Sequence, residues 1–207
     1  MELKCVRHLW GVEDSSEATF LKIQQKGYAG IEAPLPITGE AERFQGRLHD
    51  FGFFYIPQIF TQGRSVDQHL ESFAQQVEAC TAFKPVFINA HSGRDAWTEA
   101  ESSRFFVQAL EIEAQMGVTV AHETHRGRIL YNPWVTSRLL TQFPTLKLCG
   151  DFSHWVCVCE RLLDTETEII QQAAEQCLHV HARVGYEEGP QVPDPRAPRI
   201  PPPLGGA

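Results

Sequence analysis

Short runs of hydrophobic, β-favouring residues recur along the chain at intervals of roughly thirty residues, and helix-like segments separate them. Most of these runs are continuously apolar rather than alternating, which indicates parallel strands that are covered on both faces. The pattern predicts an α/β fold whose parallel strands are joined by right-handed crossovers. The seven predicted strands are Lys4–Leu9, Tyr28–Ala33, Phe53–Ile59, Pro85–Ala90, Val118–Ala121, Leu146–Cys149 and Leu178–Ala182.

The segments between these runs predict amphipathic helices. In Val66–Phe83 the apolar residues step by three or four positions, which places them on one face of a helix. A Ser or Thr followed three positions later by Glu or Gln is typical of a helix start. Such capping-box signatures occur at Ser65–Gln68, at Thr98–Glu101 and, inside the segment Glu160–Cys177, at Thr165–Glu168. The last one predicts a late start for that helix.

Two architectures fit seven strands that alternate with helices: an open doubly wound sheet, or a (β/α)8 barrel without its last unit. An open sheet usually has its site at one switch point, often with a Gly-rich phosphate loop. Neither a G-x-G-x-x-G sequence after the first strand nor a Walker A sequence is present. Charged or coordinating residues instead stand at many strand ends, as a barrel site requires. They are Glu32, His91, Glu123, Asp151 and His181. We therefore expect an incomplete (β/α)8 TIM barrel of about seven units.

Length and charge exclude several classes of protein. A chain of 207 residues is long enough for one domain with a sizeable core. The 26 acidic against 18 basic side chains, a net charge of −8, argue against partners held by bulk positive charge, such as nucleic acid or an anionic membrane. The N-terminal sequence lacks the features of a secretory signal, and no apolar run approaches the ~18 residues of a membrane span. We expect a cytoplasmic protein with six reduced cysteines.

Three polar segments follow consecutive predicted strands: His122–Arg128, Gly150–His154 and His179–Arg183. Glu123 and Asp151 are 28 residues apart, and Asp151 and His181 are 30 apart, one repeat each time. Because successive barrel strands are neighbours, these three side chains converge at one mouth. Two carboxylates and an imidazole suit a single divalent ion such as Mn²⁺, Mg²⁺, Co²⁺ or Zn²⁺. The candidates for surrounding partners or contacts to substrate oxygens are His122, His125, His154 and His179.

In these residues the chain resembles the xylose isomerase-like TIM barrels. This group of sugar phosphate isomerases and epimerases includes hydroxypyruvate isomerase, the ketose 3-epimerases, inosose dehydratases and, more distantly, endonuclease IV. The resemblance covers residues 3–198. It implies that Glu123, Asp151 and His181 are metal ligands and that Glu123 is also one of two catalytic glutamates. It further implies that His154 contacts substrate oxygens and that His179 is not the direct ligand.

Other polar and aromatic residues at the same mouth are candidates for substrate binding. Guanidinium groups match carboxylates and phosphates, and an imidazole can hydrogen-bond a substrate oxygen. An indole can form an apolar wall against a sugar face. For at least one of the two tryptophans, Trp10 and Trp155, core packing is the alternative. These candidates are Arg126, Arg128, Arg183, His91, Trp10 and Trp155. We predict a small sugar, sugar phosphate or hydroxy-keto acid as the ligand, with homo-oligomerisation left open.

The fourth metal ligand that the resemblance implies is a glutamate on a last strand. After His181 the sequence becomes rich in proline, with seven of the thirteen prolines between Pro190 and Pro203. We expect a barrel over residues 1–189 and an irregular tail over 190–207 where the last β/α unit of the family would begin. The tail has the character of a truncation or a shifted reading frame.

The expected function is that of a metal-dependent isomerase or epimerase, which removes the proton next to a carbonyl through a metal-stabilised enediolate. One alternative is a truncated, catalytically inactive metal-binding barrel, because the second catalytic glutamate is missing. Another is a zinc phosphodiesterase of the endonuclease IV type, which would use His91, Glu123, Asp151, His154, His181 and Asp194. Against it, the third predicted strand ends without a histidine, and Arg196 stands where the motif that begins at Asp194 needs one.

Overall fold

The computed structural model describes residues 2–12, 14–192, 194 and 196. The predicted irregular tail, 190–207, falls largely outside these described residues. The predicted barrel lies almost wholly inside them.

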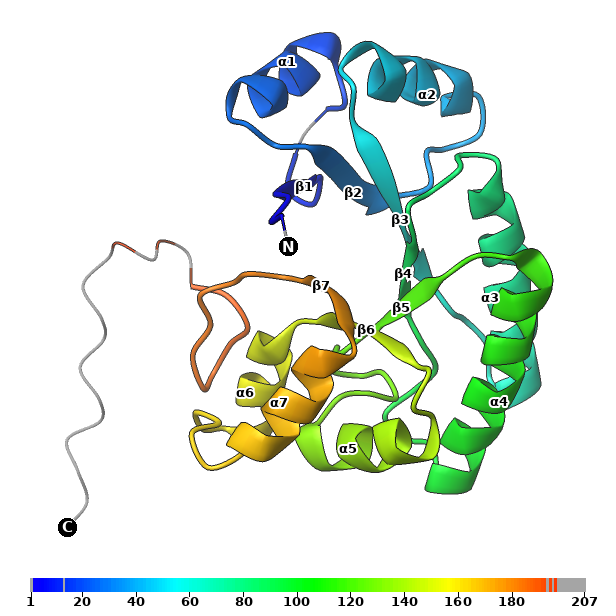
Figure 1. Ribbon diagram of the computed structural model, residues 1–207, viewed down its shortest axis with the longest axis vertical. Coiled ribbons are helices and arrows are strands. Elements are labelled where there is room, and N and C mark those ends of the chain that lie inside the picture. The colour runs from blue at the N-terminus through cyan, green and yellow to red at the C-terminus, as the bar shows by residue number, and fades with distance from the viewer. Residues whose placement is uncertain (1, 13, 193, 195, 197–207) are drawn as a thin grey trace.

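Seven strands form one parallel sheet in the order in which they occur along the chain (Figure 1). They are β1 (Val6–His8), β2 (Gly30–Pro34), β3 (Phe54–Phe60), β4 (Ile88–His91), β5 (Val120–Glu123), β6 (Lys147–Gly150) and β7 (Cys177–Val180). The helices are α1 (Glu17–Gln25), α2 (Ala41–Asp50), α3 (Val66–Thr81), α4 (Glu99–Met116), α5 (Pro133–Gln142), α6 (Phe152–Cys159) and α7 (Thr167–Glu175). The incomplete α/β barrel of seven units is confirmed.

The sheet curves, and the helices cover its outer side (Figure 1). β1 and β7 stand at the two ends of the strand order, on either side of an opening. Side chains from these two strands nevertheless meet inside the curve, because the rings of His8 and His181 lie 5.9 Å apart between centroids. Residues at the two ends of the sheet therefore approach each other inside the curve although the sheet is open.

The local signals explain most helix boundaries. The Ser65 side chain accepts the backbone N–H of Gln68 at the start of α3, and Thr98 and Glu101 form a complete capping box at the start of α4. α4 ends at Gly117, whose positive φ of 65° is easily reached only by glycine. α7 does begin late, but the predicted capping box at Thr165 is wrong. Its N-cap is Glu166, which makes no side-chain capping bond.

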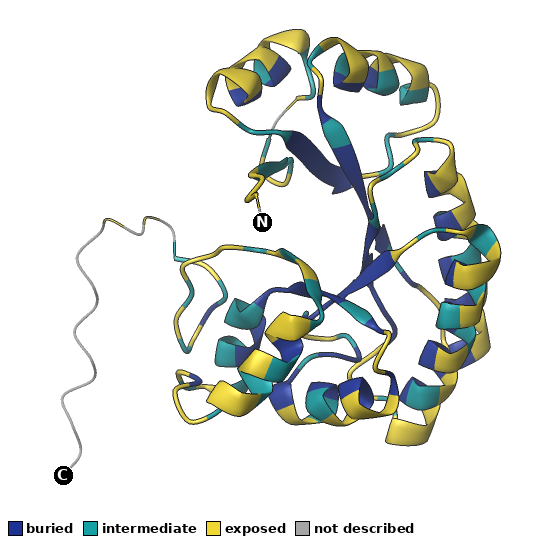
Figure 2. Cartoon of the chain, in the orientation of Figure 1, coloured by how far each residue is buried: buried dark blue, intermediate teal, exposed yellow. Residues whose placement is uncertain are grey.

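The core lies between the sheet and its helices, and the buried faces of the helices point toward the strands (Figure 2). The larger cluster joins β3–β6 to α3–α7 around Phe73, Phe105 and Trp155. A smaller one joins α1 and α2 to β2 and β3 around Phe20 and Phe44. Two clusters on one curved sheet hold the strand ends in fixed relative positions, which is what a site built from several strands requires.

β4 and β5 end later than the sequence pattern predicts, and β7 ends earlier. His91 is the last residue of β4 and Glu123 the last residue of β5, whereas the predicted strands stop at Ala90 and Ala121. β7 ends at Val180, so His181 follows it directly rather than lying within it. α6, which starts directly after Asp151, is an additional helix that the hydrophobic pattern did not separate from the loop.

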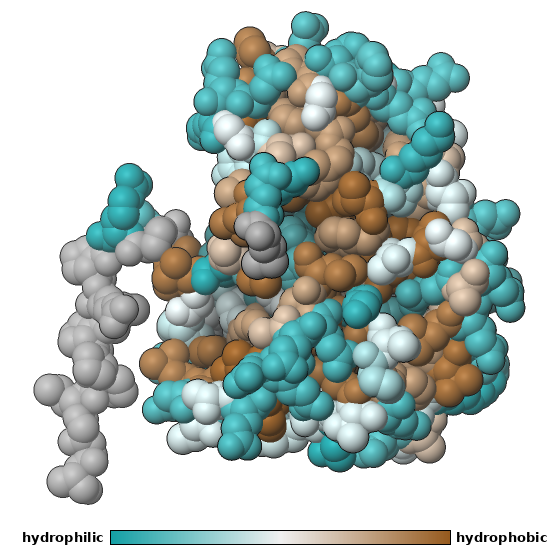
Figure 3. All heavy atoms as spheres, in the orientation of Figure 1, coloured by the Kyte–Doolittle hydropathy of each residue, from teal (hydrophilic) through white to brown (hydrophobic). Residues whose placement is uncertain are grey.

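The surface around the opening is partly hydrophobic. In the space-filling view, hydrophobic atoms gather between the upper and lower halves of the molecule (Figure 3). Exposed apolar side chains at β7 and beyond are Leu178, Val180 and Val184. All six cysteines are free thiols, as expected. Within the described residues, every helix is too short or too polar to cross a bilayer.

Candidate active site

Polar side chains from most strands of the sheet gather inside the curve. Strand residues alternate between the two faces, and the face turned away from the helices carries carboxylates, amides and imidazoles instead of apolar groups. They are His8 on β1, Glu32 on β2, Gln58 on β3, Asn89 and His91 on β4, Glu123 on β5 and His179 on β7, with Asp151 and His181 directly after β6 and β7. Six of the nine are buried, and His8, His179 and His181 are half-buried.

The three predicted metal ligands lie together in this interior. The Nδ1 atom of His181 is 3.6 Å from Oε1 of Glu123 and 3.5 Å from Oδ2 of Asp151. These same three atoms are buried and have no hydrogen-bond partner among the described residues. A buried polar atom without a partner is costly, and three of them near one another are a candidate set of ligand atoms for a shared ion.

The other polar atoms of the two carboxylates are firmly held. Oε2 of Glu123 accepts a hydrogen bond from Asn89 Nδ2 at 2.7 Å and lies 2.8 Å from Nε2 of His91. Ser153 donates its hydroxyl to Oδ1 of Asp151, and the backbone N–H of Asp151 donates to Thr124 at 2.7 Å. Each carboxylate therefore has one anchored oxygen and one oxygen that makes no hydrogen bond among the described residues.

The charges of these groups are coupled. Burial opposes ionisation of Glu123, but contacts with His181 and His91 outweigh it and hold the pKa of this carboxyl well below its usual value. The pKa of Asp151 is lowered in the same way, against burial, by His181, Ser153 and Arg183. For His181 burial favours the neutral ring, yet Cys149, Asp151 and Glu123 raise its pKa overall. In the absence of an ion, the imidazolium offsets part of the negative charge of the two carboxylates.

Three imidazoles form a row beside the carboxylates. The ring centroids of His91 and His125 are 4.4 Å apart, and those of His125 and His154 are 3.8 Å apart. Burial and the neighbouring His91 lower the pKa of His125 to about 4, and burial with His125 lowers that of His154 to about 4. Both rings are therefore neutral at pH 7. Both ring nitrogens of His154 lack a hydrogen-bond partner among the described residues and can serve a ligand.

The predicted arginines differ in their surroundings. Nε of Arg183 lies 2.9 Å from the free oxygen of Asp151 without the alignment of a hydrogen bond. Arg128 donates to the backbone carbonyls of Thr61 and Gly93 at 3.0 and 3.2 Å, so its guanidinium joins two loops. Arg126 is exposed and contacts Cys157. Of the three, Arg183 is the arginine brought to the cluster.

The remaining predicted residues are divided between the interior and other places. His179 contacts Glu32 at 3.0 Å inside the curve. His122 points to the opposite side of β5, where it packs against Phe73 and Phe106, so the expectation that it surrounds the site is wrong. Trp155 is fully buried and donates its indole N–H to a backbone carbonyl, which makes it a core residue. Trp10, in the turn after β1, is 72% exposed.

The sequence analysis gave no binding role to His8, Gln58 and Asn89, and it placed Glu32 at a strand end of the expected site without a specific role. Glu32 contacts His179 and His181 and accepts a hydrogen bond from Asn89, while Gln58 contacts His8 at 3.2 Å and His91 at 3.1 Å. The available signal was their position: each is a polar residue within a predicted hydrophobic strand or at its end. A polar residue on the inner face of a barrel strand is therefore a candidate site residue even when it belongs to no motif.

The described residues contain three groups of side chains that can hold a metal ion. They are Glu123–Asp151–His154, His91–Glu123–His125 and Cys149–His179–His181. Glu123 belongs to two of the groups, Asp151 and His181 to one each, and none of the three groups contains Glu123, Asp151 and His181 together. Asp194, which the phosphodiesterase hypothesis requires, is instead exposed and pairs with Arg196 at 3.0 Å. β3 ends at Phe60 and carries Gln58 on its inner face, so it offers no histidine where that hypothesis needs one.

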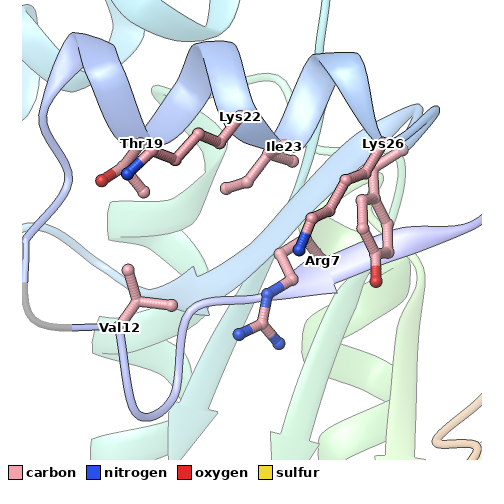
Figure 4. Close-up of a pocket in the computed structure, with 7 residues that line it drawn as sticks. Arg7, Val12, Thr19, Lys22, Ile23 and Lys26 are labelled. Atoms are coloured by element: carbon pink, nitrogen blue, oxygen red, sulfur yellow. The ribbon is translucent and has the colours of Figure 1, made fainter.

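A surface cavity of about 280 Å³ lies apart from this cluster, between β1 and α1 (Figure 4). Its lining includes the cationic side chains of Arg7, Lys22 and Lys26. Arg7 precedes His8 on β1 and so faces the helices, whereas His8 faces the interior. The cavity is therefore on the outer side of the sheet and is not part of the candidate site.

Comparison with protein families agrees with this architecture. The family described as "Xylose isomerase-like TIM barrel" matches residues 20–191, most of the chain. No curated protein sequence matches the chain at a significant level.

Several solved structures share the fold. The probable 3-DHS dehydratase AsbF from Bacillus anthracis superposes with a TM-score of 0.68 at 17% identity, covering 90% of this chain and 75% of that one. The 3-keto-D-glucoside 4-epimerase YcjR from E. coli gives 0.64 at 14% identity, covering 88% and 80%. A xylose isomerase-like TIM barrel protein from Mycobacterium smegmatis, in complex with magnesium, gives 0.63 at 11% identity, covering 87% and 74%. At these identities the likeness concerns the fold.

Proposed function

The chain belongs to the xylose isomerase-like TIM barrel family, and we propose that it is a divalent-metal-dependent isomerase or epimerase. The substrate class is a small sugar, sugar phosphate or hydroxy-keto acid. The observation that carries the proposal is the convergence of three buried atoms without hydrogen-bond partners among the described residues: Oε1 of Glu123, Oδ2 of Asp151 and Nδ1 of His181. Two carboxylates and one imidazole form a ligand set that suits Mn²⁺, Mg²⁺, Co²⁺ or Zn²⁺.

A divalent ion held by these residues would act as a Lewis acid that polarises a substrate carbonyl. The protein's own groups supply the rest. Glu123, whose low pKa keeps it ionised, would take the proton from the carbon next to the carbonyl on Oε2, the oxygen not assigned to the ion, and return it to the substrate to complete an isomerisation. The neutral rings of His125 and His154 hold substrate oxygens by hydrogen bonds, and His91 keeps the Glu123 carboxylate in place. Arg183 binds a carboxylate or phosphate group of the substrate.

Names of proteins with the same fold support the reaction class. One acts as a dehydratase and another as a 4-epimerase of a keto-glucoside, and one was solved with magnesium. Dehydration and epimerisation next to a carbonyl both begin with removal of a proton, which is the step proposed here. The shared first step supports the proposed reaction class.

The test measures binding and exchange in turn. Titration calorimetry with Mn²⁺ should show one ion bound per wild-type chain and loss of binding in Glu123→Gln. NMR in D₂O should then show exchange of the proton next to the carbonyl in at least one member of a panel of ketoses, sugar phosphates and hydroxy-keto acids. Glu113→Gln, a buried carboxylate outside the interior, is the control and should keep both properties.

Two results would contradict the proposal in different ways. Stoichiometric Mn²⁺ binding without exchange on any member of the panel would favour the alternative of a metal-binding barrel without catalysis. If the protein bound none of Mn²⁺, Mg²⁺, Co²⁺ and Zn²⁺, the proposed metal site itself would be refuted.

A further inference from the structure

The carboxylate of Glu32 lies in the interior opposite the two acidic ligands and is 1% exposed. It comes from β2, on the far side of the sheet from β6 and β7. Its two oxygens lie 3.0 Å from Nε2 of His181, one of them lies 3.0 Å from Nε2 of His179, and the other accepts a hydrogen bond from Asn89 at 2.8 Å. Glu32 is thus fully engaged, unlike Glu123 and Asp151.

The contact with His181 determines which ring nitrogen is available to a ligand. A carboxylate can only accept hydrogen bonds, so Nε2 of His181 must carry the proton. The other nitrogen, Nδ1, is the one that faces Glu123 and Asp151 at 3.6 and 3.5 Å. A histidine ligand is usually oriented in this way, with one nitrogen donating to a carboxylate and the other binding the ion.

Asn89 extends the same effect to Glu123. Its single amide nitrogen carries two hydrogens, which go to Oε1 of Glu32 at 2.8 Å and to Oε2 of Glu123 at 2.7 Å. The amide therefore joins the carboxylates of β2 and β5 and leaves Oε1 of Glu123 free. One buried carboxylate orients a ligand on each side, directly for His181 and through Asn89 for Glu123.

We propose that Glu32 is the positioning residue of the metal site: it holds His181 with Nδ1 toward the ion and, through Asn89, aims Glu123. The inference rests on the proposed function, because it concerns the same three ligand atoms. Glu32 itself has no oxygen left for the ion, and its role is to orient the residues that do.

The first test needs no substitution. NMR of the Zn²⁺-loaded protein with ¹⁵N-labelled histidine reports which nitrogen of His181 carries a proton and which binds the metal. The expected result is a protonated Nε2 and a metal-bound Nδ1. Binding of the ion through Nε2 would overturn the inference, because Glu32 could not then accept a proton from that atom.

The second test compares two buried carboxylates that each contact the Nε2 atom of a histidine. Glu32→Gln keeps the size of the side chain but removes its charge, and its Kd for Mn²⁺ should rise between ~10- and ~100-fold. Glu113→Gln makes the same change beside His122 and should leave the Kd within ~3-fold of wild type. Glu32→Asp, which retains the charge, should recover part of the lost affinity.

The outcomes separate the two hypotheses. If the wild type binds Mn²⁺ and Glu32→Gln binds it equally well, the positioning role fails while the proposed function stands. If the wild type takes up no divalent ion in either experiment, the proposed function itself fails. An equal loss of affinity in Glu32→Gln and Glu113→Gln would show a general effect of removing a buried charge and would also refute the positioning role.

Discussion

Two buried clusters in this protein combine carboxylates with imidazoles, and they lie on opposite sides of β5. We call Glu113, His122 and Ser92 the outer cluster and Glu32, Glu123, Asp151 and His181 the inner cluster. His122 and Glu123 are consecutive residues, so the alternation of the strand alone sends one side chain toward α4 and the other into the interior. The two clusters contain similar residue types but differ in how completely their polar atoms are hydrogen-bonded.

In the outer cluster every polar side-chain atom has a partner. His122 contacts Glu113 at 3.1 Å and Ser92 at 2.6 Å, and the second oxygen of Glu113 accepts the backbone N–H of Val120 at 3.2 Å. The order Ser, His, Glu is also that of a hydrolytic triad, but all three residues are buried, with the serine hydroxyl against the ring. In the inner cluster three atoms face one another without partners among the described residues. A cluster whose polar atoms all have hydrogen-bond partners is therefore interpreted as structural. A cluster in which several neighbouring atoms lack partners is interpreted as a ligand site.

The largest expected effect concerns the outer cluster. His122→Ala leaves the Glu113 carboxylate buried without its charged or polar partner and opens a cavity against Phe73 and Phe106. The unfolding free energy should fall by ~3–5 kcal/mol, measured by urea denaturation. His49→Ala removes an exposed histidine that also contacts a carboxylate, and it should change stability by less than ~0.5 kcal/mol. A loss below ~1 kcal/mol in His122→Ala would mean that the outer cluster is not a structural element.

The next largest effect concerns the inner cluster. Asp151→Asn keeps the shape of the side chain but removes the negative charge that faces His181. The Kd for Mn²⁺ should rise at least ~100-fold, a loss of ~2.7 kcal/mol in binding free energy, measured by calorimetry. The metal-free variant should be destabilised less than His122→Ala, because the inner cluster holds excess negative charge. Unchanged Mn²⁺ affinity would show that the ion binds elsewhere and that the inner cluster is not a ligand site.

The fold could be predicted from the sequence because its signals are local and repeated. Continuous apolar runs, one per repeat, gave the strands, and the capping residues Ser65 and Thr98 gave two helix starts. The errors were at both ends of strands: β1 to β6 begin one to three residues later than predicted, and β2 to β6 end one or two residues later. Strand pairing at the carboxyl ends is continued by polar residues such as His91 and Glu123, which hydrophobicity cannot distinguish from a loop.

The site could be predicted only in part, for a related reason. The spacing of Glu123, Asp151 and His181 predicts that they lie on neighbouring strands, and the three are together. The spacing could not show that Glu32, 91 positions before Glu123 and on a different side of the barrel, reaches across to His181 at 3.0 Å. That contact depends on the curvature of the whole sheet, to which every repeat contributes.

The third prediction uses the charge of the inner cluster. The raised pKa of His181 keeps its ring protonated in the metal-free protein at neutral pH, and an ion can bind Nδ1 only after that nitrogen loses its proton. The lowered pKa values of Glu123 and Asp151 keep both carboxylates ionised in this range, and those of His125 and His154, about 4, keep both rings neutral. His181 is then the group that titrates on binding.

The affinity for Mn²⁺ should therefore rise with pH, by about tenfold per unit between pH 6 and 8. Calorimetry in buffers of different ionisation enthalpy should show release of about one proton per ion bound. In the outer cluster no ion is involved, so Glu113→Gln should leave this pH dependence unchanged. A Kd that is constant from pH 6 to 8 would show that His181 is neutral before binding and is not held as an imidazolium by its acidic neighbours.

The smallest effect is expected at Trp10, which belongs to neither cluster. The residue is 72% exposed, in the turn after β1, with its backbone N–H bound to the Nδ1 atom of His8 at 2.8 Å. Trp10→Ala keeps that backbone bond and should change the unfolding free energy by less than ~0.5 kcal/mol. If the ring forms a wall for the substrate, the KM in the proton-exchange assay should rise at unchanged metal affinity.

Trp155→Ala is the matched comparison, because that indole is buried and donates to the carbonyl of Leu130 at 2.9 Å. It should cost ~3–5 kcal/mol of stability. The two tryptophans then repeat the contrast between the clusters within one residue type. The buried, hydrogen-bonded indole of Trp155 stabilises the fold, and the exposed indole of Trp10 is available to a ligand. A stability loss above ~1 kcal/mol in Trp10→Ala would assign Trp10 to the fold and remove it from the candidate site.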